Sequence, residues 1–150
     1  MTYSLHQEYA KPDADVPLWA PLYRASPSDA VIRFFKKYAT FSGRASRTEY
    51  WWWALANGIV TILLYLTAVL TGINDLTAGM MIALSLLGAW LLATLVPGWA
   101  LIVRRLHDVN LSGWMALLLL VPLVGSIVVL VFVLMDAKPE GQRFDQPVGF

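Results

Sequence analysis

The sequence predicts an all-α integral membrane protein, with three transmembrane helices preceded by a basic amphipathic helix at the membrane interface. Only 14% of its 150 residues are charged and 58% are hydrophobic, whereas soluble domains carry about 25% charged residues. Three uncharged runs, residues 50–74, 76–103 and 109–135, each exceed the roughly 20 residues that cross a bilayer. Backbone groups in lipid must satisfy their own hydrogen bonds, so we expect each run to form a helix.

The composition also narrows the classes of partner and chemistry. A net charge of +1 is too small to indicate a nucleic-acid partner. The chain contains no cysteine, which excludes disulfides and thiolate chemistry. Residues 1–25 are polar, proline-spaced and without periodicity, so we expect a flexible arm rather than a signal peptide.

The basic residues predict which side of the membrane each end occupies. Residues 33–47 contain five basic and no acidic residues, and residues 104–108 contain two arginines between the second and third runs. The loop around Asp75 has no basic residue. By the positive-inside rule the N-terminus and residues 104–108 are cytoplasmic in a multi-pass protein. After three crossings the polar tail, residues 136–150, ends outside.

A short helix is expected before the first run, over residues 26–42. Ser26 is a suitable N-cap, with Pro27 at the first helical position and Asp29 in the first turn. Aromatic and basic residues follow at helical spacing, which is typical of a helix with its rings in lipid and its cations at anionic headgroups. The other interpretation is a helix packed against a partner or its own bundle. The residues expected at the interface are Arg33, Phe34, Phe35, Lys36 and Lys37.

The start of the first span carries a second helix signal. Ser46 and Glu49 form the S-x-x-E pattern of a capping box, which gives Glu49 a structural role. Gly43 permits the bend from a flat helix to an upright one, because glycine adopts conformations that other residues avoid. The three-span domain is therefore expected over residues 43–135.

Polar and helix-breaking residues inside the runs predict contacts within the bundle. Asn57 and Thr61 lie on a stripe of small and polar residues, which should face another helix. Asn57 is expected to form an interhelical hydrogen bond, and a role as substrate or ion ligand is the alternative. Pro122 and Gly125 should kink the third run or make it partly re-entrant, which would return the tail to the cytoplasm. A broken helix that binds a transported species is the alternative for this pair.

The sequence RRLHD, residues 104–108, concentrates charge between two apolar runs. On a helix, Asp108 lies four residues after Arg104 and three after Arg105, so it can pair with either. One interpretation is an arginine site for a lipid headgroup or phosphate. A second makes His107 part of a metal site or an acid–base pair, and a third is an internal ion-pair cluster. The candidate site comprises Arg44, Arg47, Glu49, Arg104, Arg105, His107 and Asp108.

Three segments together resemble a known family. FSGRASRTEYWWW at residues 41–53, RRLHDVNLSGWMALLLLVPLVG at 104–125 and GQRFDQPVG at 141–149 are similar, in that order, to the signature blocks of the domain-of-unknown-function 805 family of small bacterial inner-membrane proteins. The tail block lacks the second glycine and the asparagine of the family pattern. The resemblance implies a multi-helix protein of the bacterial cytoplasmic membrane, and it implies no reaction. The motif positions are Arg44, Arg47, Glu49, Tyr50, Arg104, Arg105, His107, Asp108, Ser112, Gly113 and Trp114.

We expect a non-enzymatic membrane module that binds anionic lipid or a partner protein at its cytoplasmic interface, through the arginines and the basic helix. A small oligomeric transporter or channel subunit is the first alternative, and a lipid-surface enzyme is the second. The expected partners are anionic membrane lipids, with a membrane protein or a second copy of the chain as alternatives and no nucleic acid. No cofactor, metal or catalytic residue is predicted.

Overall fold

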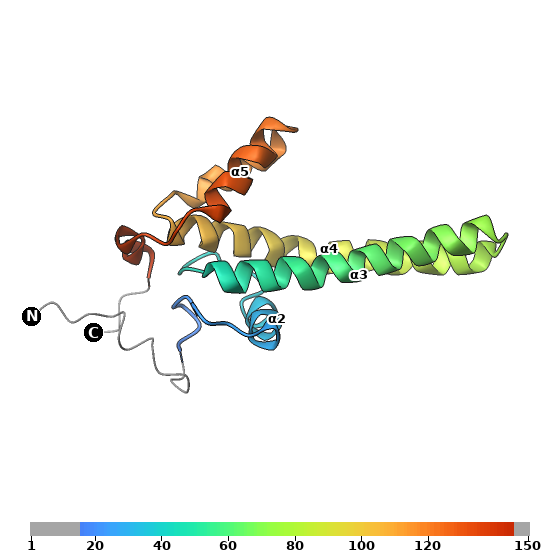
Figure 1. The fold of residues 1–150 in the computed structure, drawn as a ribbon, viewed down its shortest axis with the longest axis horizontal. Helices are drawn as coiled ribbons and strands as arrows, with labels where there is room; N and C mark the ends of the chain where they lie inside the picture. Colours follow the sequence, from blue (N-terminus) through green and yellow to red (C-terminus); the bar gives the residue numbers. More distant parts are fainter. Residues whose placement is uncertain (1–15, 146–150) are drawn as a thin grey trace, which may run out of the picture.

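A computed structural model describes residues 16–145, and Figure 1 shows their arrangement. Every regular element in this range is helical, as the sequence predicts. In chain order the elements are α2 (Pro27–Lys36), α3 (Arg47–Ile73), α4 (Thr77–Asp108), the 3-10 helix η1 (Gly113–Leu120), α5 (Val124–Leu134) and the 3-10 helix η2 (Pro139–Phe144).

The helices α3 and α4 run antiparallel as one long hairpin (Figure 1). Both are long and apolar enough to cross a membrane. Ala68 on α3 and Ala83 on α4 are buried, whereas large apolar side chains such as Leu70 and Leu92 are exposed. Packing through small residues, with large apolar groups facing outward, suits helices that are surrounded by lipid.

The third apolar run does not form one continuous helix. It forms a shorter hairpin in which η1 packs against α5, and the break falls at Pro122 to Gly125, where the sequence predicts it. A Cβ on Gly125 would lie 1.6 Å from the Leu118 carbonyl oxygen, so only glycine allows this close approach. The 8 residues of η1 and the 11 of α5 each extend about 16 Å, roughly half of a hydrocarbon core. The run therefore has the bent form and is not a third full-length helix.

The chain after α5 returns to the end of α4 from which η1 departed. The Lys138 amide donates a hydrogen bond to the Asp108 carbonyl at 2.9 Å, and η2 contacts α4. Residues 136–145 therefore lie beside residues 104–108, as expected for a re-entrant third run and not for three full crossings. Residues 146–150 of the expected tail lie outside the described range.

α2 packs across the first turns of α3 and is shorter than the helix expected over residues 26–42. Its N-terminus has a capping box, in which Ser26 and Asp29 each bond the other's backbone amide. Phe34 is buried, and its ring stacks on that of Trp53 with 3.4 Å between the ring centroids. The structure therefore agrees with the other interpretation of this segment, in which the helix packs against the chain's own bundle.

Two of the cations expected to face lipid headgroups point into the protein instead. Arg33 of α2 and Lys37, the C-cap residue that follows α2, are buried beside the carboxylate of Glu49. Phe35 and Lys36 remain exposed. The physical reason is the buried carboxylate, because a charge removed from water requires opposite charge and hydrogen-bond donors nearby.

Residues 16–25 form turns that pack against α2 and α3, so the expectation of a flexible arm is wrong for this part of residues 1–25. Ala20 and Ala25 are buried. The guanidinium of Arg33 donates to the carbonyl oxygen of Ala20 at 2.6 Å and to that of Pro17 at 3.0 Å. Residues 1–15 lie outside the described range.

Candidate functional site

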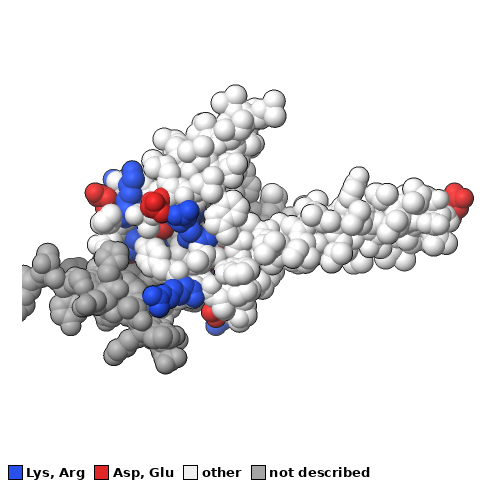
Figure 2. Space-filling model, viewed as in Figure 1, with Lys and Arg blue, Asp and Glu red and all other residues white. Residues whose placement is uncertain are grey.

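The charged side chains gather at one end of the α3–α4 hairpin, which we call the polar cap. It consists of residues 16–25, 33–50, 104–114 and 135–145. In Figure 2 the charges cluster at this end, and the long hairpin is uncharged as far as its tip. All seven residues of the predicted site lie in the polar cap. Arg44, Glu49, Arg104, Arg105 and Asp108 are buried, His107 is half-buried and Arg47 is exposed.

Glu49 connects the start of α3 to the segments around it. It completes the predicted capping box, because its Oε2 accepts a hydrogen bond from the Ser46 amide at 2.9 Å. The same oxygen accepts from the Leu22 amide at 3.3 Å. Its Oε1 accepts from Arg33 Nε at 2.6 Å. Both carboxylate oxygens are therefore engaged by donors of the protein.

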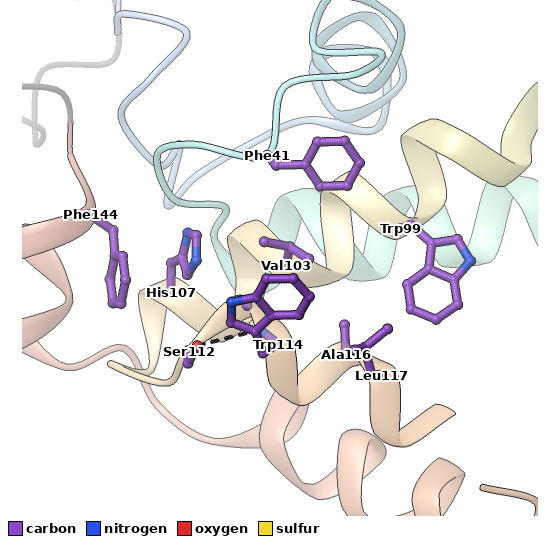
Figure 3. Close-up of a pocket in the computed structure, with 10 residues that line it drawn as sticks. Phe41, Trp99, Val103, His107, Ser112, Trp114, Ala116, Leu117 and Phe144 are labelled. Atoms are coloured by element: carbon purple, nitrogen blue, oxygen red, sulfur yellow. Dashed lines mark hydrogen bonds between the residues drawn. The ribbon is translucent and has the colours of Figure 1, made fainter. Parts of the chain in front are cut away.

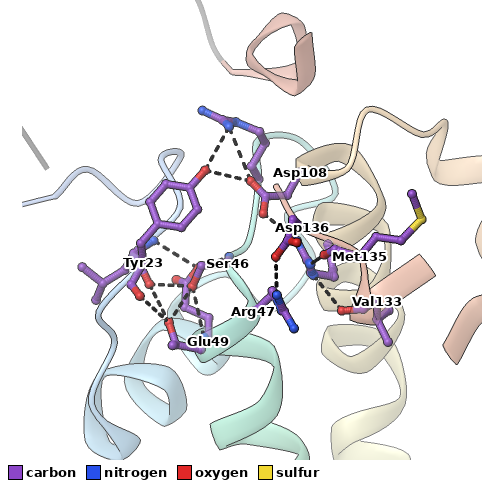
Figure 4. A network of polar contacts seen from close by, with 12 residues as sticks. Tyr23, Ser46, Arg47, Glu49, Asp108, Val133, Met135 and Asp136 are labelled. Atoms are coloured by element: carbon purple, nitrogen blue, oxygen red, sulfur yellow. Dashed lines mark hydrogen bonds and ion pairs between the residues drawn. The ribbon is translucent and has the colours of Figure 1, made fainter. Parts of the chain in front are cut away.

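Asp108 occupies the centre of a second buried group of charges (Figure 4). One carboxylate oxygen accepts from Arg105 at 2.6 Å, and the other accepts from the Tyr23 hydroxyl at 3.1 Å and from Arg44 at 3.4 Å. Arg44 also makes a bidentate pair with Asp145, at 2.8 and 2.7 Å. Burial and the nearby Asp108 carboxylate raise the pKa of Tyr23, so its phenol stays protonated and donates.

The two arginines of the RRLHD segment bind backbone carbonyls rather than facing outward. Arg104 donates to the carbonyl of Lys37 at 3.1 Å and to that of Thr40. Arg105 donates to the carbonyl of Val133 at 3.2 Å and to that of Met135. Arg104 therefore connects α4 to the end of α2, and Arg105 connects α4 to the end of α5. These contacts use donors that a phosphate site would need.

The ion pair at the rim of the polar cap is of a different kind. Arg47 pairs with Asp136, but their side chains are 46% and 91% exposed. Exposed pairs contribute little to stability, because water screens the attraction and two long side chains lose freedom.

The predicted bundle-packing residues separate into two groups. Asn57 accepts a hydrogen bond from the Trp90 indole at 3.0 Å, which joins α3 to α4 as predicted. Thr61 is in the same helix, but its buried hydroxyl has no partner among residues 16–145. Pro122 and Gly125 lie at the tip of the shorter hairpin rather than in the α3–α4 contact.

Several residues of the polar cap were not predicted from the sequence. Tyr23 was assigned to the flexible arm, and Asp136 and Asp145 to a tail on the other side of the membrane. Tyr23 and Asp136 lie in no motif or helical periodicity, and the tail block GQRFDQPVG that contains Asp145 does not by itself indicate a contact with Arg44. The sequence contains a weak signal for Trp90 as the partner of Asn57. Its indole is a hydrogen-bond donor, and it lies in the second apolar run, next in the chain to the run that contains Asn57.

A pocket of about 540 Å³ opens at the edge of the polar cap, between α4, η1 and the tail (Figure 3). His107 forms part of its wall. Its Nδ1 lies 3.0 Å from the Gly43 carbonyl oxygen, which only accepts, so Nδ1 carries the proton and Nε2 of the neutral ring is an acceptor. The described lining residues are mainly apolar: Phe41, Trp99, Val103, His107, Ser112, Gly113, Trp114, Ala116, Leu117 and Phe144.

A cation lies next to the aromatic wall of this pocket. The ring of Phe144 stacks on that of His107, with 4.0 Å between centroids. The guanidinium carbon of Arg143 lies 4.6 Å from the centre of the same Phe144 ring, and Arg143 is exposed. The pocket therefore has a mainly apolar lining, and one of its wall residues, Phe144, also contacts an exposed cation.

The family of the chain follows from comparison with known proteins. A sequence profile described as "Protein of unknown function (DUF805)" matches residues 38–146. The chain belongs to this family. Inner membrane protein YhaI of Escherichia coli (strain K12) is 40% identical over 113 residues, which cover 75% of this chain and 89% of the relative. Inner membrane protein YhaH of the same organism is 36% identical over 116 residues, which cover 77% and 93%. No solved structure matches the chain.

These relatives and the two long apolar helices agree on the class of protein. The names of both relatives place them in the inner membrane, and α3 and α4 are long and apolar enough to span it. The chain is an integral membrane protein of an inner-membrane family, as the sequence predicts.

Proposed function

We propose that this protein is a non-enzymatic module of the inner membrane that binds an anionic phospholipid at its cytoplasmic end. One acyl chain of the lipid occupies the pocket beside His107, and the headgroup lies at Arg143. The observation that carries the proposal is an apolar pocket of about 540 Å³, one of whose lining residues, Phe144, contacts the exposed Arg143. Ligand pockets of roughly 300–1,000 Å³ with few polar groups are typical of small-molecule sites.

The membrane topology in this proposal has two crossings and one re-entrant hairpin. α3 and α4 cross the bilayer, and the polar cap is cytoplasmic because it holds the basic residues whereas the α3–α4 loop has none. η1 and α5 enter the bilayer from the cytoplasmic side and return, since each is too short to cross. The N-terminus and residues 136–145 are then both cytoplasmic.

The position of the pocket favours a lipid over a water-soluble ligand. Its walls come from the last turns of α4 and from η1, next to apolar side chains that face the bilayer in this topology. Trp99 and Trp114 line it, and tryptophan is enriched at the depth of lipid headgroups. A chain that enters from the bilayer therefore reaches the pocket without crossing water.

The headgroup site differs from the one expected in the sequence. Arg104 and Arg105 are buried and bind carbonyl groups, so they do not reach a lipid phosphate. Arg143 is exposed beside Phe144, which lines the pocket. It has a single weak hydrogen bond among the described residues, to the Asn110 carbonyl at 3.4 Å. Most N–H donors of the Arg143 guanidinium are therefore free to bind a phosphate.

Filling the pocket tests the acyl-chain site. Leu117 lines the pocket and is 47% exposed, so Leu117→Trp adds volume with little effect on folding. The matched control is Leu120→Trp in the same helix, where the side chain is 69% exposed and outside the pocket lining. We expect native mass spectrometry of detergent-extracted protein to show retained phospholipid for the wild type and the control, and at least several-fold less for Leu117→Trp. Equal retention in all three would refute the acyl-chain site.

The headgroup site is tested by the choice of lipid. Arg143→Gln should abolish the preference for phosphatidylglycerol over phosphatidylcholine in the retained lipid, without reducing the total lipid by as much as Leu117→Trp does. Lys138→Gln is the control, because Lys138 is an exposed cation of the same segment and does not line the pocket. An unchanged preference in Arg143→Gln, or an equal loss in the control, would exclude Arg143 as the headgroup ligand.

A further inference from the structure

A second, much smaller cavity lies within the polar cap, between α2, α3 and α4. Its volume of about 10 Å³ corresponds to roughly one water-sized sphere. Three cations and one carboxylate are among the described residues that line it: Arg33, Lys37, Arg104 and Glu49. This cavity is separate from the His107 pocket and does not depend on the proposed lipid site.

The charges around the small cavity do not balance. Glu49 forms a close ion pair with Arg33 at 2.6 Å, and its other oxygen is occupied by two backbone amides. Arg104 bonds the neutral carbonyls of Lys37 and Thr40, which do not cancel its charge. Lys37 and Arg104 are therefore two buried positive charges in excess of the single carboxylate, which is unfavourable unless an anion is present.

Two hydrogen-bond donors at this cavity also lack acceptors. The ammonium of Lys37 has no hydrogen-bond partner among residues 16–145, and its nearest carboxylate oxygen, on Glu49, is 3.9 Å away. The Nε of Arg104 is likewise buried without a partner in the described chain. The side chain of Lys37 is 4% exposed, so bulk water does not supply the missing acceptor. Buried donors of this kind are rare and call for a bound acceptor.

We propose that this cavity binds one halide ion, which is chloride in the cell, between the Lys37 ammonium and the Arg104 Nε. A cavity of about 10 Å³ has room for one small particle only, so phosphate, sulfate and carboxylate ligands are too large for it, and the excess positive charge favours a monatomic anion over water. The ion supplies the acceptor that both donors lack and offsets part of the excess positive charge. Because Lys37 is the C-cap residue of α2 and Arg104 is on α4, the ion stabilises the packing of α2 on the hairpin.

Thermal unfolding of the full chain in neutral-lipid nanodiscs tests the proposal. Sodium chloride or bromide replaces sodium gluconate at constant ionic strength, and gluconate is too large for the cavity. We expect the Tm of the wild type to rise saturably, by about 3–6 °C at ten times the Kd. Lys37→Met should lose this rise. Lys36→Met should keep it, because Lys36 is the adjacent, exposed cation.

A direct measurement covers the case in which Lys37→Met does not fold. Crystals of the wild type grown in bromide should show an anomalous peak within hydrogen-bond distance of Lys37 Nζ and Arg104 Nε. The absence of such a peak, together with a Tm that does not respond saturably to halide, means that the cavity holds only water and overturns the proposal. An equal Tm response in Lys36→Met, Lys37→Met and the wild type overturns it as well.

The pH dependence of unfolding gives an independent readout. Burial lowers the pKa of Lys37 to about 8, Glu49 acts to raise it, and Arg33 and Arg104 lower it further. A lysine in the unfolded chain titrates near 10.5, so between these values the unfolded chain binds more protons and stability rises with pH. A bound halide raises the pKa of folded Lys37, and the rise in stability between pH 8 and 10 should be smaller in chloride than in gluconate.

Discussion

The two ends of the α3–α4 hairpin are built on opposite physical principles. Toward the α3–α4 loop, small residues such as Ala68 and Ala83 are buried, large apolar side chains are exposed, and Asp75 at the turn is the one charged residue of residues 50–103. At the polar cap, arginines and carboxylates are among the most deeply buried groups, and Arg105 and Asp108 are each 0% exposed. An apolar surface in lipid does not need to be buried. The buried charges of the polar cap are instead compensated by carboxylates and carbonyl groups of the chain itself.

This comparison has a consequence for stability. Contacts at the apolar end are numerous but individually replaceable, because lipid and side chains are alike in polarity. Contacts in the polar cap depend on one another, because removing one charge leaves another buried without compensation. Substitutions of the same chemical kind should therefore have very different effects at the two ends.

The largest effect is expected when Asp108 loses its charge. Asp108→Asn leaves Arg105 and Arg44 without their shared carboxylate, which should lower the free energy of unfolding by about 3 kcal/mol or more. Unfolding in bicelles by SDS titration measures this change. The control is Asp75→Asn at the other end, which should change stability by less than about 0.5 kcal/mol. Similar losses for both variants would contradict the contrast between the two ends.

The next largest effect is expected at the tip of the shorter hairpin. Gly125→Ala forces a methyl group against the Leu118 carbonyl, which should separate η1 from α5 at a cost of about 2–3 kcal/mol. A Cβ on Gly88 in α4 would have no heavy atom within 4 Å among the described residues outside its own helix backbone, so Gly88→Ala should be neutral or stabilising by up to about 1 kcal/mol. The same titration compares them, and a tolerated Gly125→Ala would show that η1 and α5 do not pack as described.

A smaller effect is expected within the apolar end. Asn57→Leu removes the hydrogen bond to Trp90 between α3 and α4. Interhelical hydrogen bonds in membranes contribute about 0.6 kcal/mol on average and at most about 1.7, so we expect a loss in that range. Thr67→Val is the control, since the Thr67 hydroxyl bonds only the Leu63 carbonyl of its own helix. A loss above about 3 kcal/mol would place Asn57 in a larger polar network.

The smallest effect is expected at the exposed rim of the polar cap. Arg47→Gln breaks the pair with Asp136, which should cost less than about 0.5 kcal/mol at physiological salt. Asp136→Asn should give the same result from the other partner. A larger decrease in the free energy of unfolding that disappears in high salt would instead show that Arg47 interacts electrostatically with the buried charges around Asp108.

Local signals predicted those parts of the structure that depend on neighbours in the chain. The Ser46–Glu49 capping box and the Ser26 cap are both present, because each depends on backbone amides three residues away. The break at Pro122 to Gly125 is also where the sequence predicts it. The partner of Asn57 and the inward direction of Arg33 and Lys37 were not predictable in this way, since they depend on residues of other helices.

The amino-acid sequence by itself determined that α3 and α4 are long apolar helices, where they start, and which residues carry the charge. These features follow from run length, capping patterns and the need of a backbone in lipid to bond to itself. Only the tertiary structure decided that the charges face one another and that residues 136–145 return to α4. The reason is that a buried arginine is satisfied by whichever carbonyl or carboxylate the fold places beside it, and Val133, Met135 and Asp145 are far from Arg44 and Arg105 in the chain.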